Sequence, residues 1–230
     1  MKARRAVCRE FESPSGLHFS DIMKYMNKDE WAEIWANSLL MKLSEPIYRL
    51  ISWKNYKKLL SPMILSQSSH ILELGCGPGK NSLKICKKYG CKATLVDNCK
   101  VILDKARKIF NKNNIKANFI FKDVFALKDR KKYDLVFSDG LAEHFSGFDR
   151  EKILALHASL TKRNGHILIL VPYSSKAYYI SRKFKWFKKF KEVPFSLEEL
   201  LNSCKKNNLK PVKILKPFFG AWIGVLAQRL

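Results

Sequence analysis

The 230-residue sequence lacks the features that would assign it to a membrane, to the secretory pathway or to a structural metal site. No apolar run approaches the ~20 residues that a membrane-spanning helix needs. The basic start, residues 1–10, is not followed by the apolar core of a signal peptide. The six cysteines include no C-x-x-C pair and no cluster with histidine at zinc spacing. We therefore expect a cytoplasmic protein with reduced thiols and no bound metal.

Acidic residues are scarce, since 20 Asp and Glu stand against 44 Lys and Arg, a formal net charge of +24. Such a field attracts phosphate groups, whether in nucleic acid or in anionic lipid headgroups. Most of the lysines are scattered singly along the sequence. The alternative interpretation is therefore that the excess positive charge only covers the protein surface and binds no phosphate. The sequence also lacks internal repeats and low-complexity linkers.

Short apolar runs alternate with helical patterns from His70 onward. We expect strands at residues 70–75, 92–97, 117–123, 133–140 and 165–172. Repeated strand–helix units imply a parallel sheet with helices on both faces. After a helix at about 196–207, two strands follow with so short a link that they must form an antiparallel hairpin. The sequence thus predicts an α/β fold, a doubly wound, mostly parallel seven-stranded sheet with a reversed last strand.

The region before His70 has a different pattern, with two helical stretches and no strand. One begins near Asp29, and the second runs from Pro46 to Ser61-Pro62. We expect an N-terminal helical cap at residues 1–65 and a main domain at 66–230. The cap aromatics Tyr25, Trp31 and Trp35 are candidates to close over a ligand, with ordinary core packing as the alternative.

Three glycines follow the first predicted strand at alternating positions, Gly75, Gly77 and Gly79, with Glu73 two residues before them. Glycine permits positive φ and lets a ligand touch bare backbone. The helix that begins after the turn offers free N–H groups to an anionic carboxylate.

This spacing resembles the first motif of the class I, Rossmann-like S-adenosylmethionine-dependent methyltransferases, E/D-x-G-x-G-x-G. Residues 133–145, which include Glu143 and His144, resemble the family's fourth motif, and the resemblance covers about 70–230. It implies S-adenosylmethionine as the cofactor. Asp97 would accept both ribose hydroxyls, and Asp123 with the Val124 N–H would meet the adenine. Taken singly, Asp97 could instead be a helix cap and Asp123 a turn residue.

The resemblance implies the following cofactor-binding residues: Glu73, Gly75, Gly77, Gly79, Asp97, Asn98, Asp123, Val124 and Ser138. His144 is the candidate general base, because a neutral imidazole can take a hydroxyl or amine proton near pH 7. Alternatively, His144 shapes the pocket or bonds to Glu143. His157, on an apolar helix face, is expected to be a satisfied core histidine.

Absent motifs narrow the acceptor that the resemblance implies. The fourth motif carries no N/D-P-P-Y/F, the chain has no Pro-Cys dipeptide, and no paired-glutamate loop is found. These absences argue against adenine, cytosine carbon-5 and arginine as acceptors. What remains resembles the group that acts on small molecules, including lipids, quinones and natural products.

A basic, aromatic segment at about 173–191 follows the fifth predicted strand. Its apolar positions, Tyr173, Ala177, Ile180, Phe184 and Phe187, have helical spacing. Such a helix can contact a membrane surface, stack on RNA or form a lid over the active-site mouth. Our leading hypothesis is a methyltransferase for a small, amphiphilic or anionic acceptor. An RNA methyltransferase and a catalytically silent cofactor-binding domain are the alternatives.

Overall fold

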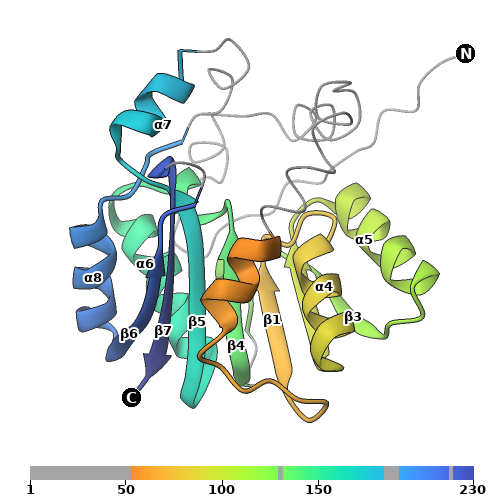
Figure 1. Ribbon diagram of the computed structural model, residues 1–230. Helices are drawn as coiled ribbons and strands as arrows, with labels where there is room; N and C mark the ends of the chain where they lie inside the picture. Colours follow the sequence, from red (N-terminus) through yellow and green to blue (C-terminus); the bar gives the residue numbers. More distant parts are fainter. Residues whose placement is uncertain (1–52, 129–131, 184–191, 218–219) are drawn as a thin grey trace, which may run out of the picture.

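The computed structural model describes residues 53–128, 132–183, 192–217 and 220–230. Within these ranges a central sheet lies between two layers of helices (Figure 1). The strands are β1 (His70–Leu74), β2 (Lys92–Asp97), β3 (Ala117–Phe121), β4 (Tyr133–Asp139), β5 (Thr161–Pro172), β6 (Leu209–Leu215) and β7 (Trp222–Arg229). The helices are α4 (Lys80–Tyr89), α5 (Lys100–Lys112), α6 (Gly147–Leu160), α7 (Lys176–Ser181) and α8 (Leu197–Lys206), and residues 53–60 form one more. Two short 3-10 turns are η1 (Val124–Ala126) and η2 (Ala142–His144).

The seven strands lie in the order β3-β2-β1-β4-β5-β7-β6. The pairs among β1 to β5 are parallel, and β7 runs antiparallel to both β5 and β6. The predicted fold, a mostly parallel doubly wound sheet with a reversed last strand, is confirmed. Strands β6 and β7 form an antiparallel hairpin, as the short link between them predicts.

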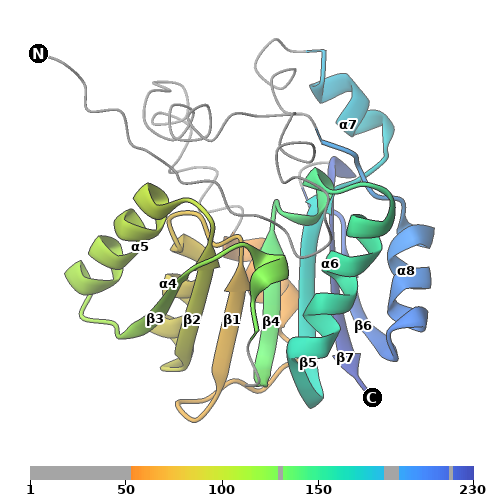
Figure 2. The ribbon, with the colours of Figure 1, turned by 180° about the vertical axis from the view of Figure 1, so that it is seen from behind.

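The two faces of the sheet carry separate hydrophobic cores because successive side chains of a strand point to opposite faces. Ile71 of β1 packs into the core formed with residues 53–60, α4 and α5. The next residue, Leu72, packs into the core formed with α6 and α8. Figure 2 shows α6 and α8 across the second face.

Helix ends follow local rules. Helix α4 ends at Gly90, whose φ of 70° only glycine adopts readily. Helix α8 begins at Ser196, whose Oγ accepts a hydrogen bond from Glu199 N. Helix α6 begins after its N-cap Ser146, and Asp149 lies in the first turn, where its carboxylate interacts favourably with the helix dipole.

Most of the predicted N-terminal cap, including Tyr25, Trp31 and Trp35, lies outside the described residues. The helix at 53–60 ends before Ser61-Pro62, as the sequence predicts. Its Tyr56 and Leu59 are fully buried in the same core as α4. The boundary between residues 65 and 66 stays a prediction.

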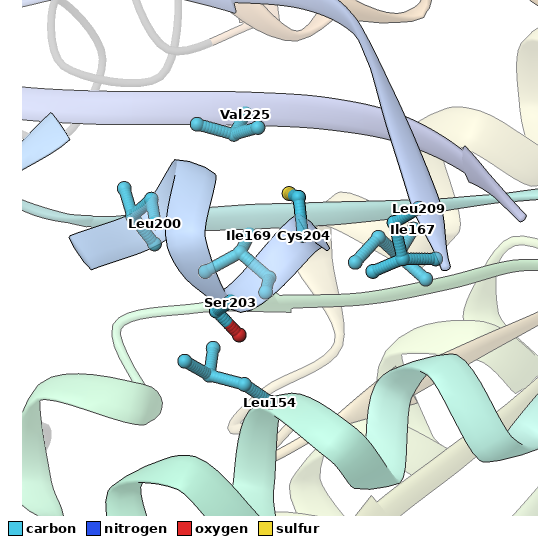
Figure 3. A pocket seen from close by; sticks show the side chains of 8 residues that line it. All are labelled: Leu154, Ile167, Ile169, Leu200, Ser203, Cys204, Leu209 and Val225. Atoms are coloured by element: carbon cyan, nitrogen blue, oxygen red, sulfur yellow. The ribbon is translucent and has the colours of Figure 1, made fainter. Parts of the chain in front are cut away.

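A small void lies in the second core, between α6, α8 and the sheet (Figure 3). It is lined by Leu154, Ile167, Ile169, Leu200, Ser203, Cys204, Leu209 and Val225. Its lining is almost wholly apolar, and its size suits a water molecule at most, so it is a packing defect rather than a ligand site. Among the helices described, none combines the length and the apolar character needed to cross a bilayer.

Candidate functional site

The strand order reverses direction between β1 and β4, because the chain passes from β1 to β2 on one side and from β4 to β5 on the other. In open α/β sheets, ligands bind outside the carboxyl ends of the strands at such a switch point. The glycine turn follows β1 there, Asp97 ends β2 and Asp139 ends β4. Helix α7 lies above this edge of the sheet (Figure 1).

The three glycines of the turn all have positive φ, 62° at Gly75, 51° at Gly77 and 66° at Gly79. A Cβ atom at Gly75 would lie 2.8 Å from Leu141 Cδ1, and one at Gly79 would lie 2.5 Å from Leu95 Cδ2. Among the residues that the structure describes, a Cβ at Gly77 would meet nothing within 4 Å. Protein packing therefore requires the outer two glycines, whereas Gly77 faces open space in which a ligand can approach the backbone.

Asp97 holds this turn in place. Its Oδ2 accepts a hydrogen bond from Gly77 N at 2.8 Å, and its Oδ1 accepts one from Cys99 N at 2.8 Å. Burial raises the pKa of Asp97, while the backbone donors of Cys99, Gly77 and Asn98 lower it. Each carboxylate oxygen retains a further acceptor site. Asp97 thus links the turn to the start of α5, and Cys99, not Asp97, is the N-cap of that helix.

Glu73 lies behind the turn. Its side chain is buried, and Oε2 accepts a hydrogen bond from Ser82 Oγ of α4 at 2.5 Å. Burial raises the pKa of Glu73 to about 8, with smaller contributions from nearby Asp139 and Asp97. The carboxyl group is therefore protonated at neutral pH.

The structure adds three residues to the crevice that the sequence did not single out. Asp139 Oδ2 accepts hydrogen bonds from Tyr56 OH at 3.1 Å and from Asn81 Nδ2 at 2.9 Å. Burial raises the pKa of Asp139 to about 6. The sequence places Asp139 at the end of a predicted strand and Asn81 just after the glycine turn, so the positions of both residues indicate a binding site. No feature of the sequence indicates Tyr56.

The adenine-side candidates lie at the ends of β2 and β3. Lys122 N donates to Asp97 O at 3.1 Å, which joins the two strand ends. Asp123 caps η1, with Oδ1 accepting from Phe125 N at 2.8 Å, and Val124 is buried. Asn98 is half-buried beside Asp97. These residues lie where a nucleoside across the carboxyl edge would reach them, and their contacts with it stay predictions.

The side chain of Ser138 is not at the crevice. It is fully buried on the α6 face of β4, where its Oγ lies 2.9 Å from His157 Nε2. His157 Nδ1 lies 2.7 Å from Ile153 O, and burial lowers the His157 pKa to about 4. The expectation of a satisfied core histidine at position 157 is therefore confirmed.

His144 ends η2, four residues after the glycine that follows β4, and is half-buried, while the preceding residue, Glu143, is almost fully buried. Within the predicted basic, aromatic segment, α7 spans Lys176–Ser181, with Ser175 as its N-cap. Tyr178 is its buried residue, and Ile180, one of the apolar positions at helical spacing, is 58% exposed. Ser175 sets this orientation, since its Oγ donates to Gly220 O at 2.7 Å and accepts from Tyr178 N. Residues 184–191 lie outside the described ranges.

The chemistry of the crevice fits an adenosyl cofactor that carries a cationic sulfonium. The turn offers bare backbone at Gly77, and the carboxyl groups of Asp97 and Asp139 lie on either side of it. Within the described part of the chain, no three His, Cys, Asp or Glu side chains gather as metal ligands would. The five cysteines described there are free and buried.

Comparison with known proteins finds similarity to methyltransferases. A family model described as a methyltransferase domain matches residues 71–165, which run from β1 into β5. Among curated proteins, the chain is 28% identical over 158 residues to phosphoethanolamine N-methyltransferase of Plasmodium falciparum, covering 64% of this chain and 56% of that protein. It is 26% identical over 157 residues to ubiquinone biosynthesis O-methyltransferase of Pelagibacter ubique, covering 63% and 62%. The chain thus spans between half and two thirds of the length of these relatives.

A solved structure with the same fold is magnesium protoporphyrin IX methyltransferase of Synechocystis PCC 6803 with bound SAH. It superposes with a TM-score of 0.67 at 14% identity, covering 91% of this chain and 97% of that one. At this identity the likeness concerns the fold.

Proposed function

The chain belongs to the class I S-adenosylmethionine-dependent methyltransferases, and we propose that it transfers the methyl group of this cofactor to an amphiphilic or anionic small molecule. The observation that carries the proposal is the turn at residues 75–79. It places an open glycine, held by Asp97, at the switch point of the sheet.

The cofactor supplies a methyl group that its sulfonium already activates. The chain's own residues have to orient the acceptor in line with that group and exclude water, which can lower a barrier by up to ~7–11 kcal/mol. Gly77 and Asp97 provide the binding surface, and Asp123 and Val124 are proposed to meet the base. His144, at the end of η2, is proposed to take the acceptor's proton.

The rim of the crevice supports an amphiphilic or anionic acceptor. On α7 the side chains of Tyr179 and Ile180 are more than half exposed, and Lys176 is exposed beside them. Lys216 Nζ donates to Tyr173 OH at 3.1 Å and lies over its ring. Apolar and cationic groups therefore occur together above the carboxyl edge. We also propose a cytoplasmic location, since buried free thiols suit a reducing compartment.

The experiment is transfer of a labelled methyl group from S-adenosylmethionine to small molecules of a cell extract, resolved by mass spectrometry. The proposal expects labelled products among anionic or amphiphilic compounds. A protein that binds the cofactor but labels nothing would be the catalytically silent domain instead. Labelled RNA would identify the basic surface as an RNA-binding surface and contradict a small-molecule acceptor.

A variant pair tests the role of His144. His144→Ala should lose turnover while keeping its affinity for the cofactor, because only proton removal is affected. His166→Ala, on β5 at the far side of the sheet, serves as the control. Normal turnover of His144→Ala would exclude the base.

A further inference from the structure

In the described part of the chain, the buried carboxyl group of Glu143 has one oxygen without a hydrogen-bond partner. Its side chain is 1% exposed, and its Oε2 makes no hydrogen bond within the described part of the chain. An unsatisfied buried polar atom is costly and rare in folded proteins, so it calls for an explanation such as a missing ligand.

The position of Glu143 connects it to the cofactor crevice. Its Oε1 lies 3.4 Å from the place that a Cβ atom would occupy at Gly140, the residue that follows β4. Leu141, between them in sequence, packs against Gly75 of the glycine turn. The carboxyl group thus lies beside the segment whose Leu141 contacts the turn that is proposed to hold the cofactor.

A second carboxyl group faces Glu143 from the segment that follows the lid. Val193 N donates to Glu143 O at 3.0 Å, which places Glu192 beside η2. Glu192 is itself largely buried, with a side chain 15% exposed. Its Oε2 lies 3.9 Å from Arg182 Nη1, an ion pair beyond hydrogen-bonding distance.

Within the described part of the chain, two arginines lie near this carboxyl pair. Arg182, from the residues after α7, acts on Glu192, and Arg150, from α6, acts on Glu143. Arg150 is already matched, because its Nε and Nη2 bond to both oxygens of Glu199. Among the described residues, Glu143 therefore forms no ion pair of its own. The nearby Asp139 adds negative charge, and Tyr178 of α7 is neutral.

We propose that Glu143 and Glu192 form the acceptor subsite of this enzyme and bind the amino group of an amine substrate. A protonated amine supplies the hydrogen-bond donors that Oε2 lacks, and its positive charge is attracted to two neighbouring carboxyl groups. The inference rests on the proposed methyl transfer and names the class of its acceptor. The anionic or apolar remainder of such a molecule would meet the rim at α7.

Burial and the like charges of Glu192 and Asp139 raise the pKa of Glu143 well above its usual value. A bound ammonium group acts in the opposite direction, because it favours the ionised form of the carboxyl group. Amine binding should therefore release a proton from the protein.

The test uses hexylamine and 1-hexanol, which differ in the amino group alone, titrated calorimetrically into the full chain with and without S-adenosylhomocysteine. Hexylamine should bind roughly tenfold or more tightly than hexanol. Glu143→Gln should remove that preference and leave hexanol binding unchanged. The control is Glu151→Gln, which loses a carboxylate on exposed α6, bonded to Lys206, and should behave as the parent.

A second readout uses the unmodified protein. Hexylamine titrations in buffers of different ionisation enthalpy should reveal proton release on binding, and hexanol should release none. Equal binding of the two probes, no proton release, or an effect of Glu151→Gln equal to that of Glu143→Gln would overturn the inference. Binding of S-adenosylhomocysteine is measured first, so loss of the cofactor function is distinguished from loss of the amine subsite.

Discussion

Arg150 and Glu199 form a two-pronged ion pair between α6 and α8, with Nε–Oε1 at 2.5 Å and Nη2–Oε2 at 3.1 Å. The same guanidinium donates to Val193 O at 2.8 Å and to Pro194 O at 3.0 Å, and it lies 3.3 Å above the ring of Phe195. One side chain therefore fixes the segment that carries Glu192 to both helices.

Replacing Arg150 by lysine should destabilise the protein by about 1–3 kcal/mol, because an ammonium group cannot reproduce the planar fork. Urea unfolding of Arg150→Lys measures the loss. Arg107→Lys is the matched control, since Arg107 pairs with Asp104 on the exposed side of α5. This substitution should lower the free energy of unfolding by about 0.5 kcal/mol or less. Equal effects of the two substitutions would contradict the role of Arg150.

Alanine at the glycines of the turn should separate packing from ligand binding. Gly77→Ala and Gly79→Ala both bear left-handed backbone strain of roughly 1–2 kcal/mol. In Gly79→Ala the added methyl group also overlaps Leu95, which should lower the free energy of unfolding by a further ~1–3 kcal/mol. Gly77→Ala should be the more stable variant yet bind S-adenosylhomocysteine weakly, because its methyl group occupies the open space. Thermal unfolding and calorimetry measure both quantities. Full cofactor affinity in Gly77→Ala would contradict the assignment.

Substituting Ser138 by alanine should lower stability without affecting the cofactor. The change removes the partner of His157 Nε2 in a fully buried position, at a cost of about 1–3 kcal/mol. The dissociation constant of S-adenosylhomocysteine should stay within about twofold of the parent value. Weaker binding at unchanged stability would instead place this side chain in the crevice.

Glu73 makes folding stability depend on pH. In the unfolded chain its carboxyl group ionises near pH 4.5, and in the folded chain its pKa is about 8. Folding must then take up a proton between these values, so the stabilising contribution is complete below pH 4.5 and is lost as the pH rises toward 8. Glu73→Gln needs no proton.

The free energy of unfolding, measured in urea at pH 5, 6, 7 and 8, should therefore fall more steeply for the parent than for Glu73→Gln. The raised pKa values of Asp139 and Glu143 also make stability fall with rising pH, but they do so equally in both proteins. The difference between the two curves therefore reports on Glu73. Parallel curves would mean that Glu73 is ionised in the folded state.

The fold and the glycine turn were predictable because their signals are local. Strand β2 matches its predicted residues 92–97. The sequence placed the start of β5 at Gly165, but the strand begins at Thr161, with an irregular register against Tyr133 and Leu135. Such irregularities depend on pairing between distant segments and leave no local pattern.

The side-chain partners in the crevice were harder to predict. Tyr56 and Asp139 are 83 residues apart and meet only once the sheet has formed. Alternation along β4 does place Ser138 and Asp139 on opposite faces, and that signal would have favoured Asp139 as the crevice residue. The isolation of Glu143 Oε2 depends on how three separate segments pack, so no spacing in the sequence shows it.

Titration of S-adenosylmethionine into the parent protein and two variants most directly tests whether the turn held by Asp97 binds this cofactor. The parent should bind one molecule per chain, and Asp97→Ala should bind more weakly by about 1–3 kcal/mol, a factor of roughly 5 to 150. Asp104→Ala, which removes a carboxylate from exposed α5, should match the parent. Absence of binding to the parent, or an Asp97→Ala affinity equal to that of Asp104→Ala, would contradict the account.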